Sequence, residues 1–232
     1  MKFVTFLNSG CIDFCKNMLF SAQKVGINLS DFYIACLDKK SFEEIGKYIP
    51  NTFIYTDCNI SSYRCWSEKI NTEFRQIMKH KFLIVKKIYE KHKNLCYLDT
   101  DIVFLKNPIQ ILKDKSNILF QSDLPGLPLC AGFFVLNDSK RCNDFMNDKE
   151  LEEMIKNYSS NGDQIIFNII ADKKYRDCIQ ILSEEKFPNG HVFYEKNIKD
   201  KAYIVHNNWI VGKKLKIQYM KNNNLWFLNE NF

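Results

Sequence analysis

The chain has few of the residues that mark unstructured or fibrous proteins. Its 232 residues include only 8 glycines and 5 prolines, which argues against a collagen-like or low-complexity protein. No internal repeat and no Ser/Gly-rich or Pro-rich linker interrupts the chain. Hydrophobic residues make up 46% of the sequence and aromatic residues 14%, enough for a substantial core. We therefore expect one domain spanning residues 1–232.

Long apolar runs are also missing. No stretch approaches the roughly 18 consecutive apolar residues of a membrane-spanning helix, and the apolar run at 3–7 is too short for the core of a signal peptide. We therefore expect no membrane span and a cytoplasmic location. The nine cysteines form no CxxC pair and are odd in number. This pattern indicates small buried thiols in a reducing compartment and not a disulfide framework.

Nucleic-acid-binding motifs are absent as well. The net charge is +6, but the basic residues are scattered along the chain and not gathered in blocks. The sequence has no recognition helix, no zinc finger and no aromatic-plus-basic stacking motif. We therefore expect no nucleic-acid partner, and a small anionic substrate remains compatible with the charge.

Strand-like and helix-like segments alternate along the first hundred residues, which predicts an α/β fold with a mostly parallel central sheet flanked by helices. Gly26 should end the first helix. Ligands bind outside the carboxyl ends of such strands, where Asn8, Asp38, Asp99 and Asp101 fall. We predict strands over 3–7, 32–37, 52–55, 95–98, 118–121, 132–136, 178–182, 191–194 and 202–205, and helices over 11–25, 41–48, 68–92, 139–158 and 164–171.

Two aspartates, Asp99 and Asp101, follow the apolar run 95–98 directly. On extended backbone this spacing places both carboxylates on one face. Two charges beside so apolar a strand are costly unless a cation lies between them. Mg²⁺ or Mn²⁺ bound to a phosphorylated ligand is the obvious candidate, because these ions prefer oxygen ligands.

Two kinds of enzyme fit this aspartate pair. One is a metal-dependent sugar-nucleotide enzyme. The other is a phosphatase resembling the haloacid dehalogenases, in which Asp99 would attack phosphorus. That superfamily normally opens with its motif, and it needs a second acidic residue near Asp163 that this chain lacks. The phosphatase is therefore the weaker alternative.

Three further features could contribute to a site. Lys81 falls on the apolar stripe of the helix predicted over 68–92, where a lysine needs a phosphate or carboxylate partner or must reach the surface. His206 follows an apolar strand and could be a third metal ligand. Asp163 and Gln164 start a helix after a turn, where they could cap the helix or present an acid and an amide to a ligand.

In this order the motifs resemble the nucleotide-diphospho-sugar transferase family, close to glycosyltransferase family 77 and related to family 8. The resemblance covers roughly residues 70–227 and rests on five segments, which are YLDTDIVFLKNP (97–108), AGFFVLN (131–137), NGDQIIFN (161–168), FPNG (187–190) and HNNWIVG (206–212). Such families often have asparagine where this chain has Cys130. The His206-to-Gly212 spacing is closer to family 77 than to family 8.

The resemblance implies a GT-A fold and a retaining hexosyl- or pentosyltransferase. Residues 1–105 would form the nucleotide-binding half, and residues 106–232 the acceptor-binding half with the C-terminal His/Lys segment. The implied donor is a UDP-sugar, and the implied acceptor is a glycan, a protein or a small molecule. Variable loops at 57–67, 122–130 and 184–200 would bind that acceptor.

The resemblance also implies roles for single residues. Mn²⁺, or Mg²⁺ in its place, would be held by Asp99, Asp101 and His206. Asp163 and Gln164 would lie near the anomeric carbon of the donor sugar. The remaining implied contacts are Lys81, Gly212 and Lys216 with the diphosphate (Lys213 and Lys214 being alternatives to Lys216), Asn8 and Asp38 with the nucleotide, and Ala131 and Gly132 with the sugar.

A non-catalytic module of the same fold, binding a nucleotide or another protein, is the alternative from a different class. The intact Asp99, Asp101 and His206 argue against it. A sugar-nucleotide pyrophosphorylase is less favoured, because no Gly-rich phosphate loop occurs near the N-terminus.

Overall fold

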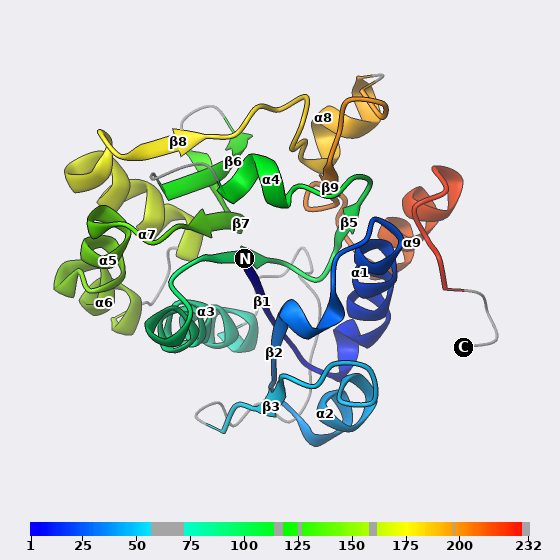
Figure 1. Cartoon of the computed structure of the whole chain (residues 1–232), viewed down its shortest axis with the longest axis horizontal. Coiled ribbons are helices and arrows are strands. Elements are labelled where there is room, and N and C mark those ends of the chain that lie inside the picture. The colour runs from blue at the N-terminus through cyan, green and yellow to red at the C-terminus, as the bar shows by residue number, and fades with distance from the viewer. Residues whose placement is uncertain (57–71, 114–117, 125–126, 158–161, 197, 229–232) are drawn as a thin grey trace.

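The computed structural model describes residues 1–56, 72–113, 118–124, 127–157, 162–196 and 198–228 (Figure 1). Its strands are β1 (Lys2–Leu7), β2 (Phe32–Cys36), β3 (Thr52–Ile54), β4 (Leu95–Leu98), β5 (Ile102–Phe104), β6 (Ile118–Leu124), β7 (Leu127–Leu136), β8 (Ile179–Ile181) and β9 (Ile204–His206). Its α-helices are α1 (Ile12–Lys24), α2 (Lys39–Ile45), α3 (Thr72–Lys91), α4 (Ile109–Lys113), α5 (Lys140–Met146), α6 (Lys149–Lys156), α7 (Asp163–Ile170), α8 (Gly190–Glu195) and α9 (Lys213–Asn222). Short 3₁₀ turns, η1 (Ser9–Cys11) and η2 (Leu29–Asp31), and a π-helical turn, η3 (Ala171–Tyr175), join some of these elements.

The central sheet has the strand order β3-β2-β1-β4-β7-β6-β8, and Figure 1 labels all of these strands except β4. The pairs β3–β2, β2–β1, β1–β4 and β6–β8 are parallel, and β7 runs antiparallel to both of its neighbours. The prediction of a mostly parallel α/β sheet is therefore confirmed. Because the first four strands are parallel, their carboxyl ends meet at one edge of the sheet, and the polar residues that follow β1, β2 and β4 are brought together there.

Alternate residues of each strand pack against helices on opposite sides of the sheet, as the strand period of two requires. Val4, Tyr97 and Phe134 belong to the core cluster that also contains residues of α3, α5, α6 and α7. Phe3 and Cys96 belong to the cluster that contains residues of α1, α2 and α4. The sheet is thus covered by helices on both faces, as Figure 1 shows.

A second, two-stranded sheet pairs β5 with β9 in antiparallel register, with Ile102 opposite His206. The apolar residues of these strands join a third core cluster with Phe14 of α1 and residues of α8 and α9. Strand β5, which follows β4 directly, therefore pairs with a strand that lies about a hundred residues later in the chain.

Several predicted elements differ from the structure. Residues 191–194 lie in helix α8 and not in a strand, because Asn189 caps the helix by accepting a hydrogen bond from the Val192 amide at 2.9 Å. The single helix predicted over 139–158 is two helices, because Asp148 caps a new one at α6. The segment 122–130 is mostly strand and not a loop. The loop predicted at 57–67 lies outside the described residues.

The absence of a membrane span was also a prediction. Among the helices that the structure describes, none combines the length and the hydrophobicity that crossing a membrane requires. Six of the seven cysteines in the described ranges are buried, and no disulfide joins any two of the seven.

Helix α1 ends where the sequence predicts. Gly26 has a φ of +78°, and its amide donates to the Gln23 carbonyl at 3.0 Å while the Ile27 amide donates to the Ala22 carbonyl at 3.0 Å. These two bonds form a Schellman motif, which needs a residue in the left-handed region at this point.

We predict that Gly26→Ala lowers the free energy of unfolding by about 1 kcal/mol, because an L side chain is strained in this conformation. Nothing lies within 4 Å of a Cβ placed there, so the loss is conformational and not steric. Gly26→Asn should lose less, since asparagine tolerates the left-handed region. Urea denaturation of both variants measures the difference, and equal losses would contradict the assignment.

Candidate functional site

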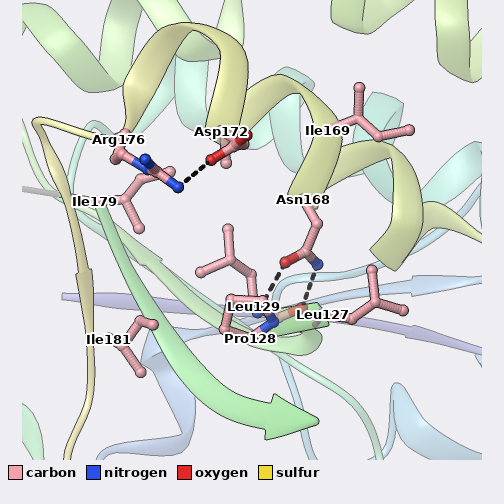
Figure 2. A pocket seen from close by; sticks show the side chains of 10 residues that line it. Leu127, Pro128, Leu129, Asn168, Ile169, Asp172, Arg176, Ile179 and Ile181 are labelled. Atoms are coloured by element: carbon pink, nitrogen blue, oxygen red, sulfur yellow. Dashed lines mark hydrogen bonds and ion pairs between the residues drawn. The ribbon is translucent and has the colours of Figure 1, made fainter. Parts of the chain in front are cut away.

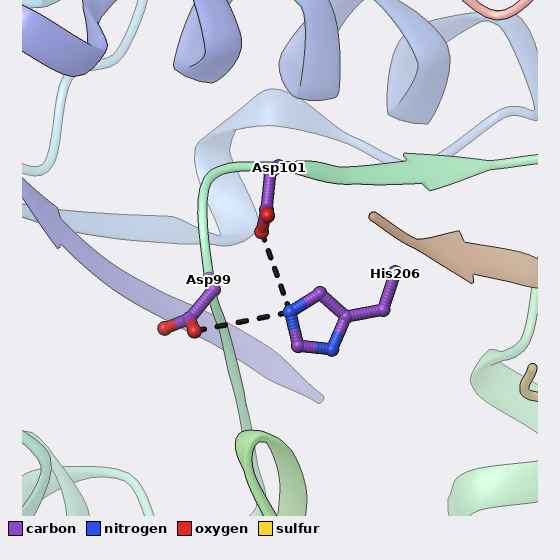
Figure 3. A group of neighbouring side chains, drawn as sticks. All are labelled: Asp99, Asp101 and His206. Carbon is purple, nitrogen blue, oxygen red and sulfur yellow. Dashed lines mark ion pairs between the residues drawn. The ribbon is translucent and has the colours of Figure 1, made fainter. Parts of the chain in front are cut away.

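Asp99 and Asp101 lie in the turn that links β4 to β5. The amide of Ile102 donates to the Asp99 carbonyl at 3.3 Å, so the backbone between the aspartates is bent and not extended. The prediction from extended spacing was wrong in this detail. Both carboxylates nevertheless approach the same imidazole, because the turn redirects Asp101 and the β5–β9 register brings His206 beside it (Figure 3).

His206 lies between the two carboxylates. Its Nε2 is 3.3 Å from Asp101 Oδ1 and 3.8 Å from Asp99 Oδ2, and Figure 3 shows both side chains turned toward this nitrogen. One ligand atom from each of the three residues lies within 4.8 Å of the others. Burial alone would lower the pKa of His206, but Asp101 raises it to about 10. The negative potential of the two carboxylates thus favours a positive charge at Nε2, and either a proton or a metal ion can provide that charge.

Gln121 of β6 fixes the orientation of this imidazole. Its Nε2 donates to the carbonyls of Phe187 and Pro188 at 3.1 and 2.8 Å, so its Oε1 faces His206 Nδ1 at 2.8 Å. An amide oxygen only accepts hydrogen bonds, and His206 Nδ1 must therefore carry the proton. In this way Nε2 is directed at the carboxylates. It is buried and has no hydrogen-bond partner among the described residues.

The absence of a side chain at Gly132 leaves room for the side chains of Asp99 and His206. The Asp99 amide donates to the Gly132 carbonyl at 2.8 Å, next to the β4–β7 ladder. A Cβ on Gly132 would lie 2.3 Å from His206 Cε1 and 2.6 Å from Asp99 Oδ2. Any side chain here would therefore displace both residues.

Lys81 of α3 extends into the same region. Its side chain is only 3% exposed, and its Nζ lies 2.6 Å from Asp163 Oδ2 and 3.6 Å from Asp99 Oδ1. It also donates to the Ala131 carbonyl at 3.1 Å. Burial would lower the pKa of Lys81, but Asp163 and Asp99 outweigh burial and raise it. The sequence left open whether Lys81 meets a phosphate, meets a carboxylate or reaches the surface. In the structure its partners are carboxylates.

Tyr97 holds the carboxylate of Asp99 in place with a hydrogen bond. Its hydroxyl donates to Asp99 Oδ1 at 2.6 Å, and its ring lies 5.0 Å from Lys81 Nζ. Burial, followed by the charge of Asp99, raises the pKa of Tyr97 well above its usual value. The hydroxyl therefore keeps its proton and acts as a donor to the carboxylate.

Of the C-terminal lysines, Lys216 is the one that contacts the aspartates. Its Nζ lies 2.5 Å from Asp101 Oδ2, whereas Lys213 pairs with Asp13 at 2.8 Å and Lys214 is exposed. Burial would raise the pKa of Asp101, but Lys216 and then His206 outweigh it and hold this pKa well below its usual range. Gly212 precedes the helix that carries these lysines and has a φ of +91°, a conformation that suits glycine.

Asn8 and Asp38 follow β1 and β2 at the same edge of the sheet. The Asn8 side chain accepts from the Gly10 amide at 3.1 Å, and Asp38 accepts from the Ser9 and Ser41 amides at 2.6 and 2.7 Å. The bond between Ser9 and Asp38 joins the loop after β1 to the loop after β2, and the other two bonds are local. Contacts of Asn8 and Asp38 with a nucleotide stay a prediction.

Asp163 and Gln164 begin helix α7, and Asn168 fastens this helix to β7. Asn168 accepts from the Leu129 amide at 3.1 Å and donates to the Leu129 carbonyl at 2.9 Å, at the edge of an apolar hollow of about 590 Å³ (Figure 2). Gln164 then accepts from the Ala131 amide at 3.3 Å and donates to Asp123 at 2.6 Å. The first turn of α7 is therefore held against the strand that carries Gly132.

Sequence reasoning missed four residues near this site, which are Gln121, Asp123, His191 and Trp209. For Gln121 a signal was present, because a fully buried glutamine follows three apolar residues in one strand. Trp209 stands within the segment HNNWIVG but was given no role of its own, and Asp123 and His191 lie in segments without a distinctive pattern. Cys130, where related families often have asparagine, lies with its Sγ 3.6 Å from His206 Nδ1.

Comparison with known sequences identifies related proteins. A family model described as nucleotide-diphospho-sugar transferase matches residues 28–220. A UDP-galactose:fucoside alpha-3-galactosyltransferase of Dictyostelium discoideum is 22% identical over 99% of this chain and 43% of its own length. The UDP-D-xylose:L-fucose alpha-1,3-D-xylosyltransferase MGP4 of Arabidopsis thaliana is 27% identical over 62% of this chain and 47% of its own. The chain thus spans about half the length of the curated relatives it matches.

Comparison with solved structures shows the fold. The glycosyltransferase GlyE of Streptococcus pneumoniae superposes with a TM-score of 0.60 at 14% identity, covering 98% of this chain and 61% of that one. The galactosyltransferase LgtC, solved with donor and acceptor sugar analogues, superposes with a TM-score of 0.60 at 10% identity, covering 99% and 98%. These neighbours are GT-A enzymes, and the predicted GT-A fold is confirmed.

We predict that Lys81→Met lowers the free energy of unfolding by about 3 kcal/mol, because it leaves a buried carboxylate without its countercharge. Asp163 is 13% exposed and pairs with this lysine at 2.6 Å, and the Ala131 carbonyl loses its donor as well. The measurement is urea denaturation in the presence of a metal chelator.

Lys39→Met is the matched control. Lys39 and Glu43 form an exposed ion pair at 3.5 Å, and losing such a pair costs about 0.5 kcal/mol or less. Similar losses in the two variants would contradict a structural role for the buried lysine.

Proposed function

Because the chain belongs to the nucleotide-diphospho-sugar transferase family, we propose that it is a glycosyltransferase that moves a sugar from a UDP-sugar to a hydroxyl group of an acceptor. The observation that carries this proposal is the convergence of Asp99, Asp101 and His206 at the carboxyl edge of the sheet. The haloacid-dehalogenase alternative is not retained, because the family model that matches residues 28–220 is that of a nucleotide-diphospho-sugar transferase and covers both aspartates.

The three residues suit Mn²⁺ or Mg²⁺. Their donor atoms are two carboxylate oxygens, which both ions prefer, and an imidazole nitrogen, which Mn²⁺ accepts more readily than Mg²⁺ does. His206 Nε2 is buried without a hydrogen-bond partner among the described residues, and Gln121 orients the ring as partners behind a metal ligand do. When bound, the ion would offset the negative charge that develops on the departing diphosphate.

One basic residue at the edge of this group, Lys216, supports a diphosphate site. Lys216 pairs with Asp101 at 2.5 Å, so its ammonium group lies beside the proposed metal ligands. A cation in this position would stabilise phosphate oxygens held by the same ion. We therefore assign the diphosphate contact to Lys216 in preference to Lys213 and Lys214.

Asp163 and Gln164 are proposed to face the donor sugar. The Lys81 pair keeps Asp163 close to Asp99, and the Ala131 amide fixes Gln164. Asp163 would stabilise positive charge at the anomeric carbon while the bond to UDP breaks. The acceptor oxygen would form the new bond, and we propose retention of the anomeric configuration.

The names of the curated relatives suggest the acceptor. The Dictyostelium relative is a fucoside galactosyltransferase, and the Arabidopsis relatives are L-fucose xylosyltransferases. We propose that this chain also transfers to a sugar hydroxyl, with UDP-galactose and UDP-xylose as the first donors to test.

We predict that Asp101→Asn weakens Mn²⁺-dependent UDP binding by at least ~100-fold, since a neutral amide replaces one of two charged ligands. Calorimetry with and without a chelator measures the binding, and nucleotide released from UDP- and GDP-sugars measures turnover. Asp172→Asn is the control, because Asp172 forms a surface ion pair with Arg176. Unchanged UDP binding in Asp101→Asn would overturn the metal assignment. A wild-type protein inert to every donor would favour the non-catalytic module.

We predict that Gln121→Leu lowers the affinity for Mn²⁺ by ~10–100-fold, because His206 Nδ1 loses the acceptor that orients the ring. Gln121→Glu retains an acceptor oxygen and should bind the ion more tightly than the leucine variant. Titration with Mn²⁺, followed by the electron paramagnetic resonance of the free ion, reports the affinity. Equal affinities in the leucine variant and the wild type would show that Gln121 does not position the ligand.

A further inference from the structure

An exposed tryptophan lies three residues after His206. Trp209 is 39% exposed, yet its one polar atom is already used, because Nε1 donates to Asp123 Oδ1 at 2.9 Å. What remains exposed is therefore apolar ring, held in place by a hydrogen bond along its edge. The ring of His191, on the adjacent helix α8, lies 6.3 Å from it at an interplanar angle of 54°.

Asp123 connects this ring to the residues proposed for the donor sugar. Its Oδ2 accepts from Gln164 Nε2 at 2.6 Å, and Gln164 Oε1 accepts from the Ala131 amide at 3.3 Å. Three hydrogen bonds thus run from the strand beside the metal-ligand group to the exposed indole. A molecule resting on Trp209 would lie next to the first turn of α7.

The same carboxylate has capacity for one more donor. Trp209, Gln164 and Asn208 donate to Asp123, the last at 3.4 Å, and a carboxylate offers about four acceptor positions. An aromatic face beside a half-buried carboxylate is suited to a ligand with an apolar face and hydroxyl groups at its edge. A pyranose ring has this character.

We propose that Trp209, with His191 beside it and Asp123 at its edge, forms the subsite that binds the acceptor sugar. The proposal rests on the proposed transferase function and adds to it the place and the chemistry of acceptor recognition. The indole stacks on the C–H face of a terminal pyranoside, and Asp123 accepts a hydrogen bond from one of its hydroxyl groups. Asp123 also positions the indole.

The test compares acceptor and donor kinetics in Trp209→Ala, Trp209→Phe and the wild type. The acceptors are the methyl glycosides of α-L-fucose, β-D-galactose and β-D-xylose, and the donors are UDP-galactose and UDP-xylose with Mn²⁺. We expect Trp209→Ala to raise the acceptor KM at least ~10-fold, because the stacking surface is lost. Trp209→Phe, which keeps an aromatic face, should raise it less. The donor KM should change by less than about twofold in both variants.

Tyr48→Ala is the control for loss of an exposed aromatic ring elsewhere, since Tyr48 is 47% exposed and lies beyond α2. An acceptor KM in Trp209→Ala within about twofold of the wild type would overturn the subsite, as would an equal rise in donor KM. Hydrolysis of the donor by water, without transfer to any of these glycosides, would also overturn it. Hydrolysis is read separately, and a wild type that neither transfers nor hydrolyses either donor would instead contradict the proposed function.

Discussion

The site depends on one constraint, which is that two neighbouring carboxylates at the edge of a buried strand require positive charge between them. Asp99 and Asp101 follow β4, and the β5–β9 register brings His206 to within 3.3 Å of Asp101. A proton on the imidazole can supply that charge, because Asp101 raises the pKa of His206. A divalent ion meets the same electrostatic need, which is why the group suits metal binding as well as folding.

Two lysines also provide positive charge beside these carboxylates. Lys216 approaches Asp101 and Lys81 approaches Asp99 and Asp163, so cations flank the carboxylates on both sides. Gly132 leaves the volume that the side chains fill. From this group the hydrogen bonds of Gln164 lead to Asp123, and so from the proposed donor side of the site to the proposed acceptor side. Donor and acceptor recognition would thus share one continuous set of contacts.

The sequence alone predicts most of what local patterns control. Strand 95–98 and the end of the first helix at Gly26 follow from periodicity and residue type. The same periodicity places Lys81 on the apolar face of its helix, but it left open whether the side chain is buried or reaches the surface. The helix at 190–195 is not predicted, because it is short and its apolar residues also fit a strand. Asn189, which caps this helix, was not recognised as a helix start. The split between α5 and α6 is missed, although the polar residues 147–150 interrupt the apolar positions of the predicted helix and Asp148 caps α6.

Contacts between distant segments are harder to predict. The approach of His206 to the aspartates could be expected by resemblance, but Gln121 and Trp209 gain their significance only from pairings 85 and 86 residues apart in the chain. No local pattern encodes such pairings. The extended-strand argument likewise led to two aspartates that do converge, but through the wrong geometry, since a turn and a second sheet bring the side chains together.

The measurement that tests the central claim most directly is pulsed electron paramagnetic resonance of Mn²⁺ added to the protein with UDP. If Asp99, Asp101 and His206 hold an ion that the diphosphate of the nucleotide completes, the spectrum should show coupling to an imidazole nitrogen and to phosphorus. The nitrogen coupling should disappear in His206→Gln. A spectrum of the free aqueous ion, or of Mn²⁺ bound to UDP without nitrogen coupling, would contradict the account.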